Sequence, residues 1–273
     1  MVIAVLTILG AAFISRATSE HYLLLRHVSS TKAFWLAEAG IAEAIEDFPN
    51  SPLSGYLGDT KNAYNTQTSL VEGFADRYRI VSTGSFTSPT GNTITRAIEV
   101  IVQVPQFGEI DDAITSTGGI TVGGAAKING TISPNSVFDF EEKFGMTEAQ
   151  LRAQADHFYT DPPNNVDPVE GVTWIEITSG DELVISDNTW SGSGVLIVNG
   201  DLKITGGDFD GVLWVNGGLE VSSGNPDIYG AIFVNCGSEE TVVLGAAEIT
   251  YDSDSIDSAL SSISPVILSW SEL

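Results

Sequence analysis

The sequence predicts an α+β protein: a long N-terminal helix, then a small antiparallel hairpin, then a mostly β domain folded as a right-handed β-solenoid. Three observations lead to this fold class. Apolar residues recur at helical spacing over residues 1–48. Two runs of alternating apolar residues follow before residue 105. Beyond that point, short strands punctuated by glycine repeat at intervals of 17 and 19 residues.

The first element is a helix from Met1 to Phe48. Its first 14 residues carry no charge, and Arg16 is the first ionisable side chain. No proline precedes Pro49, which we expect to end the helix. A helix of this length measures roughly 70 Å. A compact domain of this size cannot bury such an element, so we expect much of it to protrude or to pack on other chains.

Three interpretations of the apolar start were weighed. A cleaved signal peptide requires a basic segment before the apolar run, and none is present. A buried core helix fits poorly with the thin body downstream. A helix that is stored in a membrane and later packs among identical helices agrees best, although the apolar run covers only about 21 Å of a hydrocarbon core of about 30 Å. The candidate membrane and assembly residues are Val5, Leu9, Phe13, Glu20, Phe34, Ala37, Glu38, Gly40 and Ile41. Glu20 is expected to pair with Arg16 of a neighbouring copy or with a terminal amine.

Residues 49–73 are rich in Pro, Ser, Gly and Asn and indicate a connecting loop. Strands are predicted at Phe74–Ser82 and Thr93–Val104, joined by a turn at Ser88–Asn92. We therefore divide the chain into an assembly helix (1–48), a loop and hairpin (49–105) and an acidic solenoid domain (106–273) with a helical insertion at 136–170.

The solenoid prediction depends on three segments that align from Gly194, Gly211 and Gly230. Each contains a Val-Asn pair followed by a second short strand. Because such a short repeat cannot bury a core alone, it must stack on its neighbours. We predict an internal stack of Val198, Val215 and Val234, and a ladder of Asn199, Asn216 and Asn235 at a bend. The starting glycines are expected to allow the corners. The alternative is an antiparallel sandwich whose segments are similar by coincidence.

Two further segments are assigned within this domain. The insertion contains the sequence TEAQLRAQADHFY, a predicted helix with Thr147 as its N-cap, and we expect the insertion to cap one end of the solenoid. The C-terminal segment predicts a short helix near Ile256–Ile263 and an apolar tail, Val266–Trp270, that packs back on the body of the protein.

Composition narrows the functional classes. The formal net charge is −25, with +2 on residues 1–32 and −27 on the remainder, which makes nucleic-acid binding an unlikely role. Cys236 is the only cysteine, so neither an intrachain disulfide nor a cysteine-based metal site is expected. No catalytic, cofactor or metal residues are assigned. Acidic turns, namely Asp208 with Asp210 and the group Asp252, Asp254 and Asp257, are expected to bind calcium weakly at most. Trp190, beside SGSG, is the tryptophan that we expect to be exposed.

The run LTILGAAFISRATSE (Leu6–Glu20), followed by AFWLAEAGIAEA (Ala33–Ala44), resembles the N-terminal region of PilX-type minor pilins and of the related pseudopilins of type IV pilus and type II secretion systems. The glycine-rich repeats resemble those of some PilX-like proteins and of bactofilin-type solenoids. The resemblance implies a non-enzymatic structural subunit that is anchored in the inner membrane, with a periplasmic or extracellular body, and that assembles with other pilin-like subunits into a surface filament.

Two other functions remain open at this stage. One is a membrane-anchored surface adhesin or carbohydrate-binding module that never enters a filament. The other is a polysaccharide-active enzyme on a β-helix, with the carboxylates of Asp208 and Asp210 as its acid and base.

Overall fold

The computed structural model describes residues 2–48, 54–56, 62–88, 91–237 and 240–273, without the side chains of residues 2–8, 54 and 56. The chain forms two compact units. The first is Met1–Val104 together with Pro265–Leu273, and the second is Pro105–Ser264. Each unit buries its own hydrophobic core.

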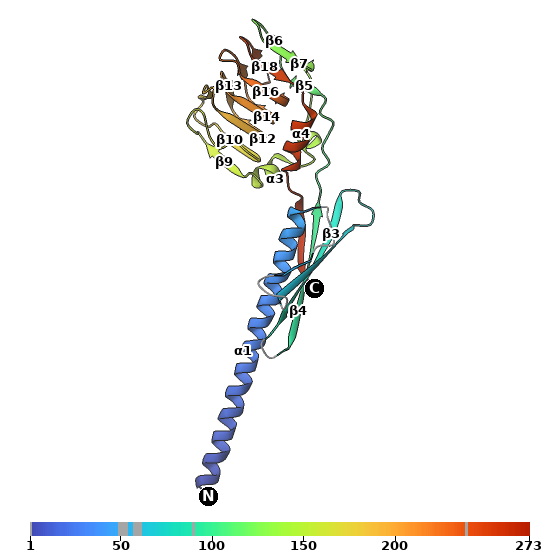
Figure 1. Ribbon diagram of the computed structural model, residues 1–273, viewed down its shortest axis with the longest axis vertical. Helices are drawn as coiled ribbons and strands as arrows, with labels where there is room; N and C mark the ends of the chain where they lie inside the picture. Colours follow the sequence, from blue (N-terminus) through green and yellow to red (C-terminus); the bar gives the residue numbers. More distant parts are fainter. Residues whose placement is uncertain (1, 49–53, 57–61, 89–90, 238–239) are drawn as a thin grey trace. The chain divides into compact units, whose positions relative to one another are not determined.

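The first unit begins with helix α1 (Val2–Glu46), which runs without interruption as predicted (Figure 1). A turn at Asp47 and Phe48 follows, and the predicted stop at Pro49 lies outside the described residues. All side chains from Leu9 to Val28 are exposed, whereas from Ser29 onward one face of the helix is buried.

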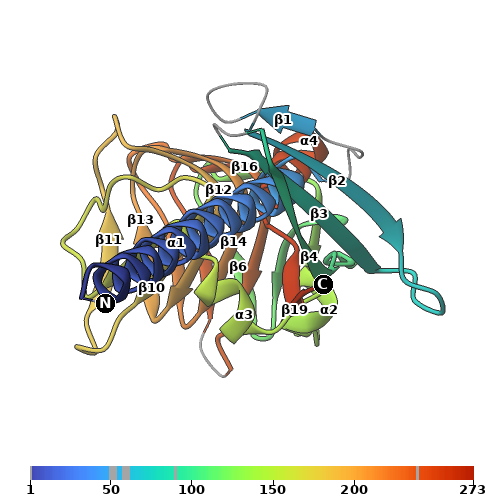
Figure 2. The ribbon, with the colours of Figure 1, turned by 90° about the horizontal axis from the view of Figure 1, so that it is seen from below.

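The sheet of the first unit has the strand order β1-β2-β3-β4-β19, with each neighbouring pair antiparallel (Figure 2). Its strands are β1 (Ser54–Tyr56), β2 (Asn62–Leu70), β3 (Arg77–Thr87), β4 (Thr93–Gln103) and β19 (Val266–Glu272). The alternation predicted for the second strand of the hairpin is correct, because Ile98, Val100 and Val102 are fully buried with Ile80 under the helix. The predicted hairpin is thus the centre of a larger sheet.

Two sequence predictions fail in this sheet. The expected loop at 49–73 contains β1 and β2. In β2 the polar residues hide the strand period, since Thr66 is its one fully buried side chain. The apolar tail Val266–Trp270, which we include in the predicted solenoid domain 106–273, belongs to the first unit, where it forms β19 and pairs with β4. Pairing partners distant in sequence cannot be identified from local pattern alone.

Glycine allows α1 to approach the sheet closely. A Cβ at Gly84 of β3 would lie 2.1 Å from the carbonyl oxygen of Ala33 and 2.4 Å from the amide nitrogen of Ala37. On the helix side, a Cβ at Gly40 would lie 2.4 Å from Oγ of Ser82. Because helix backbone cannot move aside locally, any larger residue at position 84 pushes the helix away from the sheet.

The second unit is a β-solenoid, as predicted. One of its sheets has the order β7-β18-β16-β14-β12-β10-β9, and the other has the order β11-β13-β15-β17-β6, with parallel pairing throughout. The strands are β5 (Asp112–Ser116), β6 (Ile120–Val122), β7 (Lys127–Asn129), β8 (Thr131–Ser133), β9 (His157–Thr160), β10 (Val172–Glu176), β11 (Glu182–Ile185), β12 (Ser191–Asn199), β13 (Asp201–Ile204), β14 (Asp208–Asn216), β15 (Leu219–Val221), β16 (Asp227–Val234), β17 (Thr241–Val243) and β18 (Glu248–Thr250).

The repeat alignment predicts the register correctly, since Gly194 pairs with Gly211 and Gly211 with Gly230. These glycines lie inside the long strands β12, β14 and β16, not at corners between strands. Their φ angles are 97°, 139° and 131°, in the region that favours glycine. Each would place a Cβ about 2 Å from the carbonyl oxygen of the preceding rung, so glycine is required there for space as well.

The insertion at 136–170 does cover one end of the solenoid. It contains α2 (Phe140–Phe144) and α3 (Glu148–Ala153). Thr147 is the N-cap of α3 as predicted, and it also forms a capping box with Gln150. The predicted helix ends early, because His157–Thr160 forms β9 and pairs with β10. Beyond β9, the Asn165 amide donates to the carbonyl of Val184, and the Asn165 side chain accepts from the amides of Ser186 and Asp187. The edge of β11 is thereby occupied.

The opposite end of the solenoid is formed by the first residues of the unit. Strand β5 pairs with β16, β6 with β17 and β7 with β18, so the earliest segment stacks on the latest one. Helix α4 (Ser253–Ser261), which is capped by Asp252, packs on β12, β14 and β16 with Ala259 close to Gly211. The first strands of the unit are therefore spatial neighbours of its last strands, although they are far apart in the sequence.

The connections between the units give a testable prediction. Because Gln103 and Val266 are paired neighbours in the sheet, replacing residues 105–264 with an Asn-Gly turn should leave the first unit folded. Its hydrophobic core loses no member by this deletion. We expect a cooperative thermal unfolding transition by circular dichroism in detergent. A chain that also lacks β19 is the control, and it should unfold less cooperatively. A non-cooperative transition in the variant that keeps β19 would contradict an independently folding sheet.

Candidate functional site

The N-terminal half of α1 forms an uncovered apolar surface. Its large apolar side chains are exposed in this chain: Leu9, Phe13, Ile14, Tyr22, Leu23, Leu24, Leu25 and Val28. Phe13 and Ile14 are each 71% exposed. Single exposed apolar residues are ordinary on protein surfaces, but a continuous run of them indicates an interaction surface. We call residues 9–28 the uncovered helix surface. In the part of the chain that the structure describes, no helix meets the length and hydropathy of a membrane-crossing segment.

Four polar side chains of the uncovered helix surface form bonds within the helix itself. Nε of Arg16 lies 2.9 Å from Oε1 of Glu20, one turn further along. The hydroxyls of Thr18 and Ser19 donate to carbonyl oxygens four residues earlier, at 2.8 and 2.9 Å. Glu20 therefore pairs inside its own helix, whereas we predicted a neighbour. These internal bonds lower the cost of moving the surface into apolar surroundings.

The other predicted assembly residues lie elsewhere. Ala37, Gly40 and Ile41 are buried, and with Phe34 they pack against the sheet of their own unit. Glu38 is half-buried beside them. They hold α1 on the sheet, which corrects their assignment to a face between subunits. The side chain of Val5 lies outside the described residues.

An aromatic cluster that the sequence did not reveal lies on the first unit. The ring of Phe34 meets Trp35 and Trp270 edge-on at centroid distances of 6.3 and 5.9 Å. Trp35 is 62% exposed and Trp270 48% exposed. Trp190, which we expected to be exposed, is buried and donates to the carbonyl of Val166. The pairing of β19 with β4 places Trp270 beside Phe34, and no local pattern carries that information.

In the solenoid, Val198, Val215 and Val234 stack in register and are fully buried. The asparagine side chains form a ladder. Asn235 donates to Asn216 at 3.3 Å, and Asn216 donates to Asn199 at 2.7 Å.

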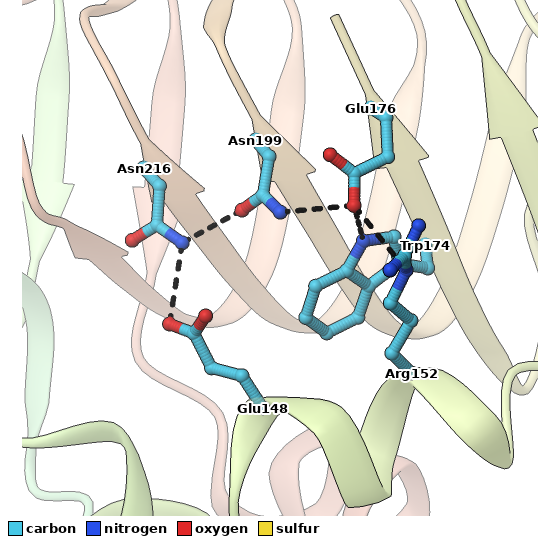
Figure 3. A network of polar contacts seen from close by, with 6 residues as sticks. All are labelled: Glu148, Arg152, Trp174, Glu176, Asn199 and Asn216. Carbon is cyan, nitrogen blue, oxygen red and sulfur yellow. Dashed lines mark hydrogen bonds and ion pairs between the residues drawn. The ribbon is translucent and has the colours of Figure 1, made fainter.

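The ladder ends in a polar network at α3 (Figure 3). Asn199 donates to Oε1 of Glu176, which also accepts from Trp174 at 2.7 Å. From α3, Arg152 pairs with Glu176 at 3.4 Å and Glu148 accepts from Asn216 at 3.5 Å. These groups bond one another, so the network tethers α3 to the sheet and leaves its carboxylates engaged.

Asn216 is the centre of this network, because it also accepts from Nε1 of Trp214 at 2.9 Å. Replacing Asn216 with Ala should lower the free energy of unfolding of the solenoid by about 1–3 kcal/mol, since the buried indole N–H loses its partner. Denaturant unfolding followed by tryptophan fluorescence measures the change. Asn235→Ala removes one exposed bond and is the matched control, with a smaller expected loss. Equal losses would contradict a central role for Asn216.

The predicted acidic pair lies on the outer face of β14. Asp208 pairs with Asp227 of β16, which pairs with Glu248 of β18. Partial burial, followed by the charges of Asp208 and Glu248, raises the pKa of Asp227. Partial burial, followed by Asp208 and Asp252, raises the pKa of Asp210. Within the described residues no group of three or more His, Cys, Asp or Glu side chains is placed to hold a metal ion. Asp208, Asp227 and Glu248 thus place like charges in register on neighbouring strands, and we call these three residues the acidic column.

Asp210 also lines a polar cavity of about 580 Å³ between β12, β14 and α4. The cavity is bordered by Gly171, Ser193, Gly194, Asp210, Asp254, Ser255, Ser258, Ala259 and Ser262. Hydroxyl and carboxylate groups of this kind bind cations or sugar hydroxyls. Its lining includes neither a histidine or basic side chain nor an aromatic ring on which a sugar could stack. Among the described residues that line the cavity, no histidine or basic side chain is placed to act with Asp210 in catalysis.

The acidic column predicts a pH dependence. A raised pKa means that folded Asp227 binds its proton more tightly than the unfolded chain does. The partial burial of its charge, followed by repulsion from Asp208 and Glu248, therefore destabilises the fold at neutral pH, and this effect fades on acidification. Asp227→Asn should stabilise the solenoid at about pH 7 by about 0.5 kcal/mol or less, after solvent screening. The gain should shrink as the pH falls through the raised pKa. Thermal unfolding at several pH values tests this, with exposed Asp181→Asn as the control. A gain that does not depend on pH would contradict it.

Comparison with known proteins finds matches among solved structures alone. No protein-family model matches this chain, and no curated protein matches it. Among solved structures, the competence-associated pilin ComZ from Thermus thermophilus is similar, with a TM-score of 0.29 and 11% sequence identity over 90% of this chain and 98% of that chain. At this score the similarity carries no argument, so function must be derived from the surfaces described above.

Proposed function

We propose that this protein is a pilin-like structural subunit that assembles with other pilin-like subunits through the uncovered helix surface. The observation that carries the proposal is the contrast between the two halves of α1. The second half packs on its own sheet, whereas residues 9–28 expose large apolar side chains that no other described residue covers. Apolar surface of this extent is stable only in lipid or against other apolar surfaces.

On this proposal the uncharged start of α1 is held in the inner membrane before assembly. In the filament, contacts between helices replace contacts with lipid. The internal Arg16–Glu20 pair and the back-bonded hydroxyls support this role, because they reduce the polar surface that either environment must solvate.

The distribution of charge supports an outward-facing solenoid. Residues 105–264 hold 26 acidic and four basic side chains, a net charge of −22, whereas the rest of the chain carries −3. A body with such charge stays soluble outside a filament core, and it repels bodies of the same kind. The assembly contact therefore belongs to the nearly neutral first unit, with the solenoid displayed at the cell surface. No catalytic role is proposed for it.

Cysteine crosslinking in native cells tests this proposal. In a Cys236→Ser background, Leu24→Cys places a thiol on the uncovered helix surface, where the native side chain is 60% exposed. We expect a ladder of covalent oligomers in sheared surface material. Ala37→Cys is the matched control, since Ala37 is fully buried against its own sheet and should give no ladder.

A second variant tests the chemistry of the contact. Phe13→Glu should reduce the Leu24→Cys ladder more than about tenfold, because an unpaired charge is costly in an apolar interface. Leu70→Glu, at a 54% exposed apolar position of β2, should leave the ladder unchanged. Monomers confined to membranes would contradict the filament and favour an anchored adhesin.

A further inference from the structure

The face of the first sheet that carries α1 is covered unevenly. Helix α1 lies over β2, β3 and β4, and β19 is the edge strand next to β4. Ile267 pairs with Val102 and Trp270 with Val100, so these four side chains share the face that meets the helix. Val100 and Val102 are fully buried, whereas Ile267 is 54% and Trp270 48% exposed. Helix α1 therefore leaves the apolar side chains of β19 bare.

Helix α1 borders this bare strand with two aromatic rings. Phe34 reaches Trp270 with ring centroids 5.9 Å apart, and Trp35 lies beside Phe34 with its side chain 62% exposed. We call Phe34, Trp35, Ile267 and Trp270 the aromatic step, because the strand forms its floor and the helix its side. Trp35 follows exposed Val28 by seven residues, so the step continues one face of the uncovered helix surface.

The width of the aromatic step fits a helix. Helix α1 lies chiefly over β3, and β19 is two strand spacings away, about 10 Å. Packed helices have axes about 8–10 Å apart. A second helix therefore fits beside α1 over β19, where it would cover Ile267 and Trp270 and contact the rings of Phe34 and Trp35.

Lipid is a poor occupant of the aromatic step. Trp35 follows Leu9 by 26 residues, about 39 Å along α1, whereas a hydrocarbon core is about 30 Å thick. The exposed charges of Arg26 and Lys32 lie between them. With the uncharged start of α1 in a membrane, the step stands outside the hydrocarbon, and another protein surface must cover it.

The charges near the aromatic step favour the helix of a second copy. Arg96 of β4 is engaged within the unit, since it pairs with Glu272 at 3.1 Å and donates to Ser30 at 2.8 Å. Glu38, one turn beyond Phe34 and Trp35, is half-buried and has no ion-pair partner within the described residues. On the uncovered helix surface, exposed Arg26 also lacks a partner there. An apolar helix that carries Arg26 is thus complementary to the step.

We propose that the aromatic step receives the uncovered helix surface of a second copy, which lies beside α1 over β19 with its Arg26 near Glu38. The inference rests on the proposed assembly through residues 9–28, and it adds the surface that this helix meets. The step supplies what that helix requires: apolar area of matching width, two exposed indole rings and one unpaired carboxylate.

Photocrosslinking in native cells tests this contact. With p-benzoyl-phenylalanine in place of Ile267, irradiation should join two copies, and mass spectrometry should map the link to residues 9–28 of the second copy. Leu70 in β2, on the other side of the sheet, is also 54% exposed and is the matched position. It should give at least about tenfold less of this link. A link from position 267 to lipid, to its own solenoid or to a different protein would overturn the proposal.

Oligomers of the Leu24→Cys chain, measured in the same cells, separate this proposal from the assembly on which it rests. If these oligomers form while position 267 gives no link to residues 9–28, the aromatic step is not the receiving surface and the assembly stands. If the oligomers do not form, both proposals fail.

Charge reversal tests the pairing beside the aromatic step. Glu38→Arg brings two cations together and should reduce the link from position 267 about tenfold, and adding Arg26→Glu should restore it. Glu43→Arg, at an exposed position of the same helix, is the matched control and should leave the link unchanged. Thermal unfolding checks that each variant is folded. A link that Glu38→Arg does not reduce, or a loss in the folded variant that Arg26→Glu does not reverse, would overturn the proposal.

Discussion

The fold of the larger unit depends on one constraint: a single rung of strands cannot bury its own apolar side chains. Each column of valine, leucine or isoleucine becomes dry only when a rung stacks on either side, in register, through parallel backbone hydrogen bonds. The glycines inside the long strands follow from the same requirement, because rungs spaced by backbone hydrogen bonds leave no room for a Cβ there. So does the asparagine ladder, which repeats a side-chain amide at that spacing. Stacking also creates two ends, where the core has no further rung to cover it.

Helix α1 shows how one uninterrupted helix serves two environments. Its C-terminal half contributes small residues, such as Ala33 and Ala37, that let the sheet come within backbone contact. Its N-terminal half contributes large apolar residues and hydroxyls that bond back to the helix. The change occurs near Ser29 without a break in the helix. Small side chains let the C-terminal half of the helix pack closely on its own sheet, whereas large side chains give the N-terminal half a wide apolar surface for contact with other molecules.

The sequence predicts what is local or periodic. The long helix, the central hairpin, the repeat register and the Thr147 capping box are all recoverable from spacing and residue type. Pairings between distant segments are not. The tail at Val266 and the early strand β5 both join sheets far from their sequence neighbours, and a short apolar strand has no preference for one edge over another. The sequence predicts that much of the helix protrudes, but it also assigns Ala37 to assembly, because helical spacing alone does not say which face of a helix meets its own sheet.

The position of β19 has a consequence for biosynthesis. Strands β1 to β4 leave the ribosome before the solenoid, but β19, which pairs with the edge of β4, follows the whole solenoid in the sequence. The solenoid is therefore synthesised in full while the neighbouring sheet still exposes the edge of β4. A prematurely terminated chain would retain the helix and the solenoid but would keep this edge open. Pairing of β19 with β4 therefore requires that the whole solenoid has been synthesised, and a protease that recognises unpaired strand edges would discriminate chains that contain β19 from chains truncated before it.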